Sequence, residues 1–353
     1  MGSLSTIEED ASMEEITTIG LDLAKNIFQA HGSDSDGRVL LRKKLRREQL
    51  LPFFAKQPAC MVAMEACSSS HHWGREIGAL GHTVRLIPPA YVKPFVKRQK
   101  NDASDAEAIC EAVLRPTMRF VAVKSEQSQA AAIVFRTRDL LVRQRTQIIN
   151  ALRGHLAEFG IVVAQGPAHV SKLVMVVQDP EMSLPDMARP VLGVLVDMLA
   201  TLDERIKVLD KEIARRAKED EVAHRLMTIP GIGPVIATAL TALAPAASTF
   251  KRGRDFAAWL GLTPLQHSTG GKQRLGRTSK MGERTLRRLL IIGASTVVRW
   301  AAKKGSDVGT WLASMLKRKP PMLIRFALAN KMARIVWALM AKGGIYRAPV
   351  VAV

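Results

Sequence analysis

The feature of this sequence that most constrains its fold is a change of hydrophobic periodicity near residue 125. Before this point, short apolar runs with the two-residue alternation of β-strands are separated by helix-like segments. After it, apolar residues recur every three or four positions over long stretches, which is typical of helices. Strands that alternate with helices form layered α/β domains. We therefore expect a mixed α/β domain over residues 16–124 and a mainly helical remainder.

The first part of the chain predicts a sheet that opens with a hairpin. Residues 19–23 alternate as a strand, and the extended runs 28–31 and 39–41 flank the turn sequence Asp34-Ser35-Asp36-Gly37. Residues 1–15 are polar and predict a disordered leader. Further strands are expected over residues 60–64 and 83–87, and helices over residues 46–56, 73–80 and 103–114.

Residues 125–220 predict a helical spacer. The segment 125–159 is helical in pattern, and after a connector with Gly and Pro a second helix carries apolar residues at alternating steps of four and three. Such spacing is typical of a coiled-coil seam. Two interpretations stay open, an extended spacer or dimer arm and two helices of one compact bundle. The seam residues are Leu195, Leu199, Leu202, Ile206, Leu209 and Ile213.

The last region, residues 221–353, is mainly helical in pattern. It contains Ile229-Pro230-Gly231-Ile232-Gly233-Pro234 ahead of an apolar run. Gly231 and Gly233 favour a tight turn whose backbone amides could meet a DNA phosphate, as in helix-hairpin-helix proteins. A plain helix–helix turn is the alternative. Four tryptophans of this region are expected in the core rather than as base-stacking platforms: Trp259, Trp300, Trp311 and Trp337.

The charge of the chain indicates a polyanionic partner. Its formal net charge is +20 and its pI about 10.3, although residues 1–36 hold eight acids and one base. Because the cations are spread along the chain rather than set on one amphipathic helix, nucleic acid is favoured over a membrane surface. Three cysteines indicate a reducing compartment, and the apolar stretch 321–341 is interrupted by Arg325, Lys331 and Arg334. We expect a cytoplasmic, nucleoid-associated protein without a membrane span.

Four carboxylates occupy positions from which the predicted sheet could bring them together. Asp22 lies in the first strand and points to the face opposite its apolar neighbours, while Glu65 closes another strand. Asp102 and Asp105 share one face of the predicted helix. Mg²⁺ would relieve their mutual repulsion, and two ions roughly 4 Å apart could activate a nucleophile and stabilise a leaving oxygen. The alternative is that Asp102 and Asp105 only cap the helix.

A second candidate site is a hydroxyl-bearing glycine turn in a cationic stretch. Ser268 and Thr269 precede Gly270-Gly271, and residues 251–300 hold eleven Lys and Arg against two acids. A hydroxyl here could attack phosphorus, although residue chemistry alone favours hydrogen bonding to DNA phosphates. A helix capped by Thr278 or Ser279 is expected to follow, with arginines that grip phosphates. The candidate phosphate-binding residues are Lys272, Arg274, Arg277, Lys280, Arg284, Arg287 and Arg288.

At these residues the chain resembles the DEDD transposases of bacterial insertion sequences, which are described as bridge-RNA-guided recombinases. The resemblance covers nearly the whole length. In the N-terminal part it rests on Ile19-Gly20-Leu21-Asp22-Leu23-Ala24-Lys25, Met64-Glu65-Ala66 and Lys100-Asn101-Asp102-Ala103-Ser104-Asp105-Ala106. In the C-terminal part it rests on Ile229-Pro230-Gly231-Ile232-Gly233, Gly261-Leu262-Thr263-Pro264, Ser268-Thr269-Gly270-Gly271 and Ser279-Lys280-Met281-Gly282 with Leu286-Arg287.

The resemblance implies a RuvC/ribonuclease-H-like domain in which Asp22, Glu65, Asp102 and Asp105 bind Mg²⁺. It also implies a C-terminal transposase domain whose serine forms a covalent phosphoserine link with DNA. Implied partners are donor and target double-stranded DNA, a noncoding bridge RNA, and further copies of the chain in a dimer or tetramer whose sites form between subunits. Family members often have Ser-Gly at the nucleophile, whereas here Thr269 precedes the glycine; we favour Ser268, with Thr269 as the alternative.

The leading hypothesis is therefore a magnesium-dependent transposase that cleaves, exchanges and rejoins DNA strands. One alternative is a RuvC-like nuclease that cleaves DNA junctions with water and leaves no protein–DNA adduct. Another is an architectural protein that binds RNA and DNA and whose acids are structural caps.

Overall fold

The structure is a computed structural model that describes residues 15–97, 101–304 and 309–347. Apart from Glu15, the predicted leader over residues 1–15 lies outside these ranges. The chain divides into two compact units, Met1–Gln127 and Ser128–Val353, and each is described by itself. None of the described helices is long and apolar enough to cross a membrane.

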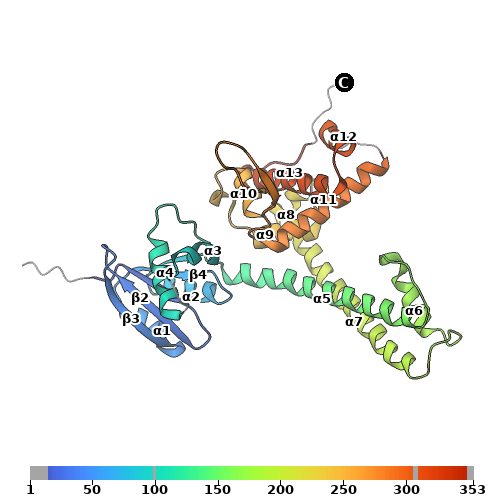
Figure 1. Cartoon of the computed structure of the whole chain (residues 1–353), viewed down its shortest axis with the longest axis horizontal. Helices are drawn as coiled ribbons and strands as arrows, with labels where there is room; N and C mark the ends of the chain where they lie inside the picture. Colours follow the sequence, from blue (N-terminus) through green and yellow to red (C-terminus); the bar gives the residue numbers. More distant parts are fainter. Residues whose placement is uncertain (1–14, 98–100, 305–308, 348–353) are drawn as a thin grey trace, which may run out of the picture. The chain divides into compact units, whose positions relative to one another are not determined.

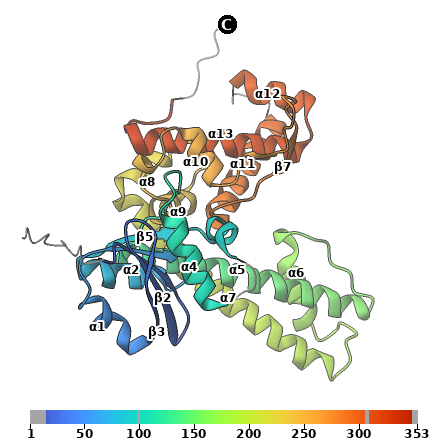
Figure 2. The same ribbon diagram turned by 60° about the vertical axis from the view of Figure 1, so that its left-hand side comes forward.

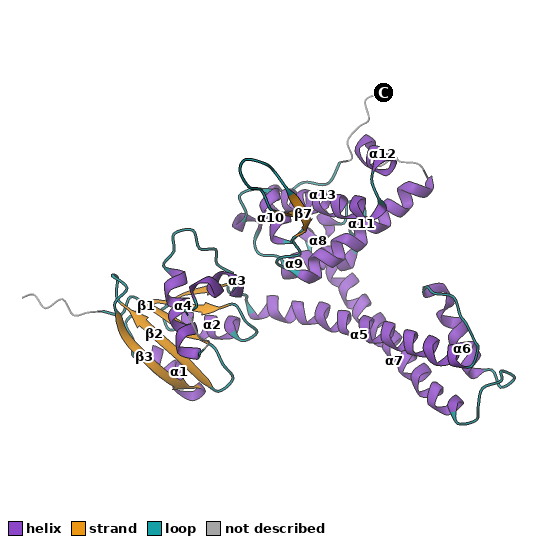
Figure 3. Ribbon diagram, viewed as in Figure 1, coloured by secondary structure: helices purple, strands orange, loops and turns teal. Residues whose placement is uncertain are grey.

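The first unit is built on a five-stranded mixed sheet (Figures 1 and 3). Its strand order is β3-β2-β1-β4-β5, with β1 central. β1 is antiparallel to β2 and parallel to β4, and the predicted hairpin is the antiparallel β2–β3 pair. The strands are β1 (Thr18–Asp22), β2 (Ile27–Ser33), β3 (Val39–Arg46), β4 (Met61–Glu65) and β5 (Thr83–Ile87).

Helices cover both faces of this sheet. Alternate residues of the strands point to opposite faces, so Ile19 and Leu21 pack with α1 and α2, while Ala63 and Ile87 pack with α3 and α4. The predicted helices are present, although the one expected over residues 46–56 is shorter. The helices are η1 (Arg47–Gln49), α1 (Leu50–Phe54), α2 (Ser70–Ala79), α3 (Pro89–Val92), η2 (Lys93–Phe95) and α4 (Asp102–Val113).

The helical spacer consists of three helices. Helices α5 (Glu126–Glu158), α6 (Val170–Gln178, after η3, Pro167–His169) and α7 (Ala188–Glu219) share a core of their own. Figures 1 and 2 show α5 and α7 side by side, and ion pairs Arg138–Asp210 and Arg145–Asp203 join them. Leu199, Ile206 and Ile213 of the predicted seam are buried, whereas Leu195, Leu202 and Leu209 are half-buried. The seam therefore packs against helices of its own chain.

The remaining helices enclose the largest apolar cluster of the described residues. Phe256, Leu290 and Val336 are among its most buried members. Its elements are α8 (Glu221–Leu226), α9 (Pro234–Leu243), η4 (Ala247–Thr249), α10 (Gly253–Trp259), α11 (Arg284–Lys304), α12 (Gly309–Arg318) and α13 (Pro321–Lys342), with a two-stranded hairpin of β6 (Pro264–Gln266) and β7 (Leu275–Thr278).

Two of the four tryptophans in this region are not core residues. Trp259 and Trp337 are half-buried, but Trp300 is 54% exposed and Trp311 is 37% exposed. The expectation that all four lie in the core was therefore wrong for Trp300 and Trp311. Helical periodicity places a side chain on a face, but it does not say which neighbouring element covers that face.

Candidate active site

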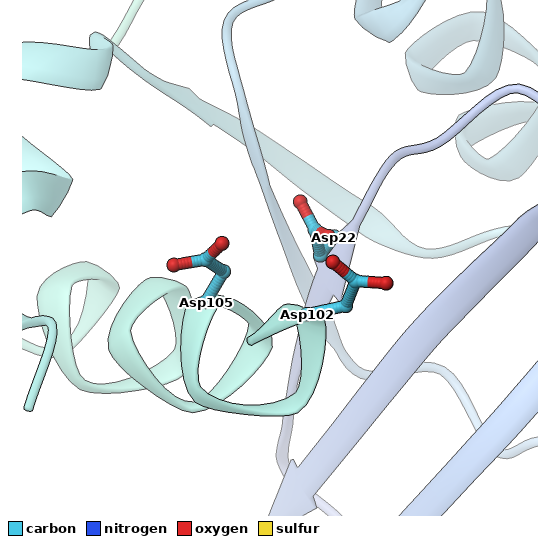
Figure 4. Close-up of side chains that lie close together, drawn as sticks. All are labelled: Asp22, Asp102 and Asp105. Atoms are coloured by element: carbon cyan, nitrogen blue, oxygen red, sulfur yellow. The ribbon is translucent and has the colours of Figure 1, made fainter. Parts of the chain in front are cut away.

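Three of the four predicted carboxylates meet at the end of the central strand. Carboxylate oxygens of Asp22, Asp102 and Asp105 all lie within 4.8 Å of one another. Asp22 is the last residue of β1, and the other two acids occupy the first turn of α4 (Figure 4). Asp22 and Asp105 are half-buried and Asp102 is exposed, so the cluster is open on one side.

A close contact between β1 and α4 creates this cluster. Gly20 lies two residues before Asp22 and therefore faces the same side of the sheet. A Cβ at Gly20 would overlap the carbonyl oxygen of Ala106 and lie 2.6 Å from the amide nitrogen of Cys110. Because position 20 has no side chain, α4 lies directly on β1 and its first turn reaches Asp22. A glycine inside a strand is the sequence signal for such an approach.

The two acids of α4 are not its N-cap. That role belongs to Asn101, which has extended backbone angles and whose Oδ1 accepts a hydrogen bond from the Ser104 amide at 2.8 Å. Asp102 and Asp105 therefore follow the cap, and their carboxylates lie beside Asp22. The alternative that Asp102 and Asp105 only cap the helix is therefore wrong, because Asn101 occupies the N-cap position.

The electrostatics of the cluster favour a cation. Burial, and after it repulsion by Asp105, Asp102 and Glu65, together raise the pKa of Asp22 from 3.8 to about 6. Half-buried acids that repel one another in this way gain stability from a shared cation. An all-oxygen donor set suits a hard divalent ion such as Mg²⁺.

Glu65 lies near the cluster but outside its tightest group. It ends β4, which pairs in parallel with β1 so that Met64 is opposite Leu21. The residues that follow, Glu65 and Asp22, are therefore at the same edge of the sheet. Glu65 repels the Asp22 carboxylate, although the close group of three does not include it.

The predicted hydroxyls lie on the exposed β6–β7 hairpin. Its tip is the turn Thr269-Gly270-Gly271-Lys272. The Thr269 amide donates to the Lys272 carbonyl oxygen at 3.3 Å, and the Lys272 amide donates to the Thr269 carbonyl oxygen at 3.0 Å. Gly270 and Gly271 have φ of 54° and 73°, as a type I′ hairpin turn requires. Ser268 is exposed, and its Oγ accepts a hydrogen bond from the Arg274 amide at 3.2 Å.

Ser268 and Thr269 point to opposite faces of this two-stranded ribbon. The pairs Gln266 with Leu275 and Thr269 with Lys272 fix the register, and neighbouring residues of a strand alternate between faces. The two neighbouring hydroxyls therefore belong to different faces of the ribbon.

The base of the hairpin is anchored by a close backbone crossing. A Cβ at Gly282 would overlap the carbonyl oxygen of Trp259, and one at Gly261 would lie 2.7 Å from the amide nitrogen of Met281. The Ser279 amide also donates to the Thr263 carbonyl at 2.8 Å. The helix start predicted at Thr278 or Ser279 was wrong. Thr278 ends β7, and α11 begins at Arg284 after this crossing.

Two of the predicted phosphate-binding arginines have structural partners. Arg287 is 9% exposed, and its Nη1 donates to the carbonyl oxygens of Leu260 at 3.1 Å and Met281 at 2.7 Å. Arg288 forms an ion pair with Asp139 of α5. Burial argues against Arg287 as a phosphate ligand, whereas Arg288 has a side chain that is 41% exposed and stays a predicted one. A run of arginines on a helix does not reveal which face is covered. The residues of the set that are exposed are Lys272, Arg274, Arg277, Lys280 and Arg284.

The Gly231 and Gly233 turn joins α8 to α9 as a helical hairpin. Gly231 has φ of 83° and faces α11, where a Cβ would lie 2.7 Å from the carbonyl oxygen of Gly293. Gly233 is exposed and precedes the first turn of α9. Gly231 therefore serves packing, and Gly233 is the more exposed of the two glycines.

The sheet order, the helices on both faces and the acidic cluster at the end of the central strand are consistent with a ribonuclease-H-like domain.

Comparison with known proteins defines the family. A DEDD transposase model of the IS110 type matches residues 19–161, and the "Transposase IS116/IS110/IS902 family" model matches residues 223–308. The chain is 49% identical to the "Probable family 20 transposase" of Pseudomonas aeruginosa over 94% of this chain and 99% of that protein. It is 41% identical to the transposase of IS1328 from Yersinia enterocolitica, over 95% of this chain and 99% of the relative. The corresponding values for the transposase of IS1111A from Coxiella burnetii are 37%, 95% and 93%.

The chain therefore belongs to the IS110/IS116 family of insertion-sequence transposases.

Proposed function

We propose that this transposase cleaves and rejoins DNA strands through a covalent phosphoserine intermediate, with the acidic cluster and the β6–β7 hairpin acting on the same phosphodiester. The observation that carries the proposal is the convergence of Asp22, Asp102 and Asp105 within 4.8 Å. Carboxylates so placed repel one another, and this arrangement is disadvantageous for folding unless the group has a ligand.

In this proposal Asp22, Asp102 and Asp105 hold Mg²⁺, and Glu65 supports them from the neighbouring strand. The bound ion supplies Lewis-acid stabilisation of charge on the phosphate oxygens. The carboxylates would hold the ion at the ends of β1 and α4, and the ion in turn would attract the scissile phosphate to this edge of the sheet. The open side of the cluster, where Asp102 is exposed, admits the phosphate.

Ser268 is the proposed nucleophile. Its Oγ forms a bond to phosphorus as the bond from phosphorus to the 3′ oxygen breaks, and the 3′ oxygen leaves with a proton as a hydroxyl. The Arg274 amide orients Oγ through the hydrogen bond that this oxygen accepts. The resulting ester conserves the phosphodiester for rejoining, when a 3′ hydroxyl of the exchanged strand attacks it and releases Ser268. Thr269 is the alternative nucleophile on the opposite face of the ribbon.

We further infer that the exposed cations between residues 272 and 284 bind the DNA backbone, together with the Gly233 amide. The relevant side chains are Lys272, Arg274, Arg277, Lys280 and Arg284. The proposal also includes a bridge RNA that pairs with donor and target DNA, and an oligomer in which subunits share sites. A net charge of +20 supports nucleic acid partners in general. Sequencing the RNA that copurifies with the protein tests this part, and a discrete transcript of the insertion sequence is the expected result.

The test of the nucleophile is a trap for the covalent intermediate. The wild type and the variants Ser268→Ala, Thr269→Ala and Asp105→Asn are incubated with labelled donor DNA and Mg²⁺, and adducts are resolved by denaturing electrophoresis. Ser268→Ala is expected to lose adducts and to bind DNA as the wild type does. Thr269→Ala should retain adducts, and Asp105→Asn should reduce them by at least about a hundredfold.

Adducts that persist in Ser268→Ala and vanish in Thr269→Ala would move the nucleophile to the opposite face of the ribbon. Cleavage without any adduct in the wild type would contradict the covalent step and favour hydrolysis by water.

A further inference from the structure

The C-terminal unit contains a pocket whose lining differs from that of both sites above. It has a volume of about 900 Å³ and lies between α10, α12, α13 and the base of the β6–β7 hairpin. This is within the range of sites that bind organic ligands. The lining residues Pro264 and Thr278 are the pair that begins the hairpin.

Three aromatic side chains line the pocket: Trp311, Phe326 and Trp337. The indole of Trp337 is held in place because its Nε1 donates to the Ala247 carbonyl at 3.1 Å. Trp311 is 37% exposed, and the Lys331 ammonium lies 4.6 Å from its ring centroid. This cation–π contact restrains the ring. The pocket thus offers restrained aromatic surfaces that a second flat ring can contact.

The charge of the lining is entirely of one sign. Arg252, Arg254, Lys331 and Arg334 are cationic, and none of the described lining residues is acidic. The nearest acid along the chain is Asp255, which forms an ion pair with Arg252 at 3.5 Å. Asp255 does not neutralise the other three cations of the lining. The ligand that fits must therefore combine a flat apolar ring with negative charge.

The aromatic and the cationic side chains of the pocket come together on one face of α13. Leu323, Ala327, Asn330, Arg334 and Trp337 follow one another at steps of four and three residues and form one stripe of the helix that faces the pocket. The small side chain of Ala327 leaves room between the larger ones. At the N-terminus of α10, Gly253 packs against Arg334 and Trp337, where a Cβ would lie 3.1 Å from the Arg334 carbonyl oxygen. The neighbours of Gly253, both arginines, are thereby placed at the pocket rim.

We propose that this pocket holds an unpaired nucleotide, with its base against the aromatic side chains and its phosphate against the arginines. A paired base cannot enter, because both faces of its ring are covered by stacked neighbours in a duplex. Ser268 follows Pro264 by four residues, which spans at most about 13 Å of extended chain. The pocket would therefore hold a strand close to the hydroxyl. The proposal deepens the proposed strand exchange but does not depend on the phosphoserine step.

The test measures binding of single strands and duplex by fluorescence anisotropy, with EDTA present so that no strand is cut. The probes are a short labelled oligothymidylate, an oligouridylate of the same length and a mixed-sequence DNA duplex. Trp311→Ala and the double variant Arg254→Ala/Arg334→Ala are each expected to weaken single-strand binding about tenfold, and duplex binding by about twofold or less. Trp311→Phe should keep most of the affinity, since it keeps an aromatic face.

Arg299→Ala is the matched control, because it removes one exposed cation of α11 that does not line the pocket. It should weaken the binding of all three probes equally and by about twofold or less. If Trp311→Ala lowers the melting temperature, Arg334→Glu replaces it, since Arg334 is exposed. Tighter binding of oligothymidylate would identify a displaced DNA strand as the ligand, and tighter binding of oligouridylate would identify RNA.

The proposal is overturned if Arg334→Glu and the Arg254→Ala/Arg334→Ala variant bind single strands as tightly as the wild type. It is also overturned if they lose single strands and duplex by the same factor. The same assay on Ser268→Ala should give wild-type affinities, so a failure of the pocket proposal is distinguishable from a failure of the nucleophile.

Discussion

The acidic cluster and the β6–β7 hairpin differ in how much of the surrounding protein packs against them. The cluster lies where a central strand and a helix are in direct contact, and Gly20 makes that contact possible. The hairpin is a two-stranded ribbon whose residues 264–277 are all exposed. A two-stranded ribbon is marginally stable by itself. The acidic cluster is therefore fixed by the packing of the fold, whereas the hairpin is presented to solvent.

The largest difference that we expect is between glycine-to-alanine substitutions in the acidic cluster and in the hairpin. Gly20→Ala places a Cβ against Ala106 and Cys110, so we expect it to lower the stability of the first unit by about 3 kcal/mol and to abolish strand exchange. Gly271→Ala is strained at φ of 73° by about 1–2 kcal/mol, but an added Cβ meets no atom within 4 Å, so the loss should be smaller than that of Gly20→Ala and confined to the second unit. Hydrogen exchange of amides in each unit measures both effects.

Gly78→Ala is the control for the first of these variants. Gly78 lies in α2, and a Cβ added to it would have no atom within 4 Å, so alanine should stabilise the helix by about 0.5–1 kcal/mol. If Gly20→Ala were as harmless as Gly78→Ala, the contact between β1 and α4 would not be what creates the acidic cluster.

Much of the N-terminal site was predictable because side chains in a strand alternate between the two faces every residue, so a few residues suffice to assign a face. Asp22 alternates with apolar neighbours, so its face of the sheet followed from the sequence, and Glu65 ended a recognisable strand. The role of Asn101 as cap and the exclusion of Glu65 from the closest group were not predictable. They depend on where α4 begins and how it lies on β1, which are tertiary features.

In the C-terminal unit, the sequence indicated the glycine turn and the cationic stretch but not the fate of each arginine. Arg284, Arg287 and Arg288 look equivalent along the chain, yet one is exposed, one is buried and one pairs with α5. Which face of α11 is covered depends on the crossing at Gly261 and Gly282, residues far enough apart that local patterns do not reveal their contact.

The second prediction uses this difference between neighbouring arginines. Arg287→Ala removes a buried guanidinium that binds two carbonyl oxygens at the base of the hairpin, so we expect a loss of about 2 kcal/mol in the stability of the second unit. Arg284→Ala should leave the stability within about 0.5 kcal/mol and weaken DNA binding by about twofold to fivefold. Chemical denaturation and binding at fixed salt measure the two quantities. Equal effects of both variants on DNA binding, with stability unchanged, would show that Arg287 contacts DNA and does not anchor the hairpin.

The weakest effect that we expect concerns the pH dependence of the acidic cluster in metal-free protein. Burial and the neighbouring acids raise the pKa of Asp22 to about 6 in the folded chain, whereas the unfolded value is 3.8. The folded state therefore binds more protons between these values, so its stability falls as pH rises from about 4 to about 6 and is constant above. Because Asp22 is partly exposed to solvent, the loss is on the order of 1–2 kcal/mol.

Asp22→Asn removes this charge and should make the metal-free protein more stable than the wild type at about pH 7.5 by that amount. Addition of Mg²⁺ should then stabilise the wild type more than the variant, since the wild type keeps all three carboxylates. Thermal unfolding in EDTA and in Mg²⁺ measures both differences. If the wild type and the variant were equally stable across this pH range, the three acids would not repel one another in the folded chain. The contrast between a packed cluster of repelling acids and an exposed hairpin would then fail for the acids.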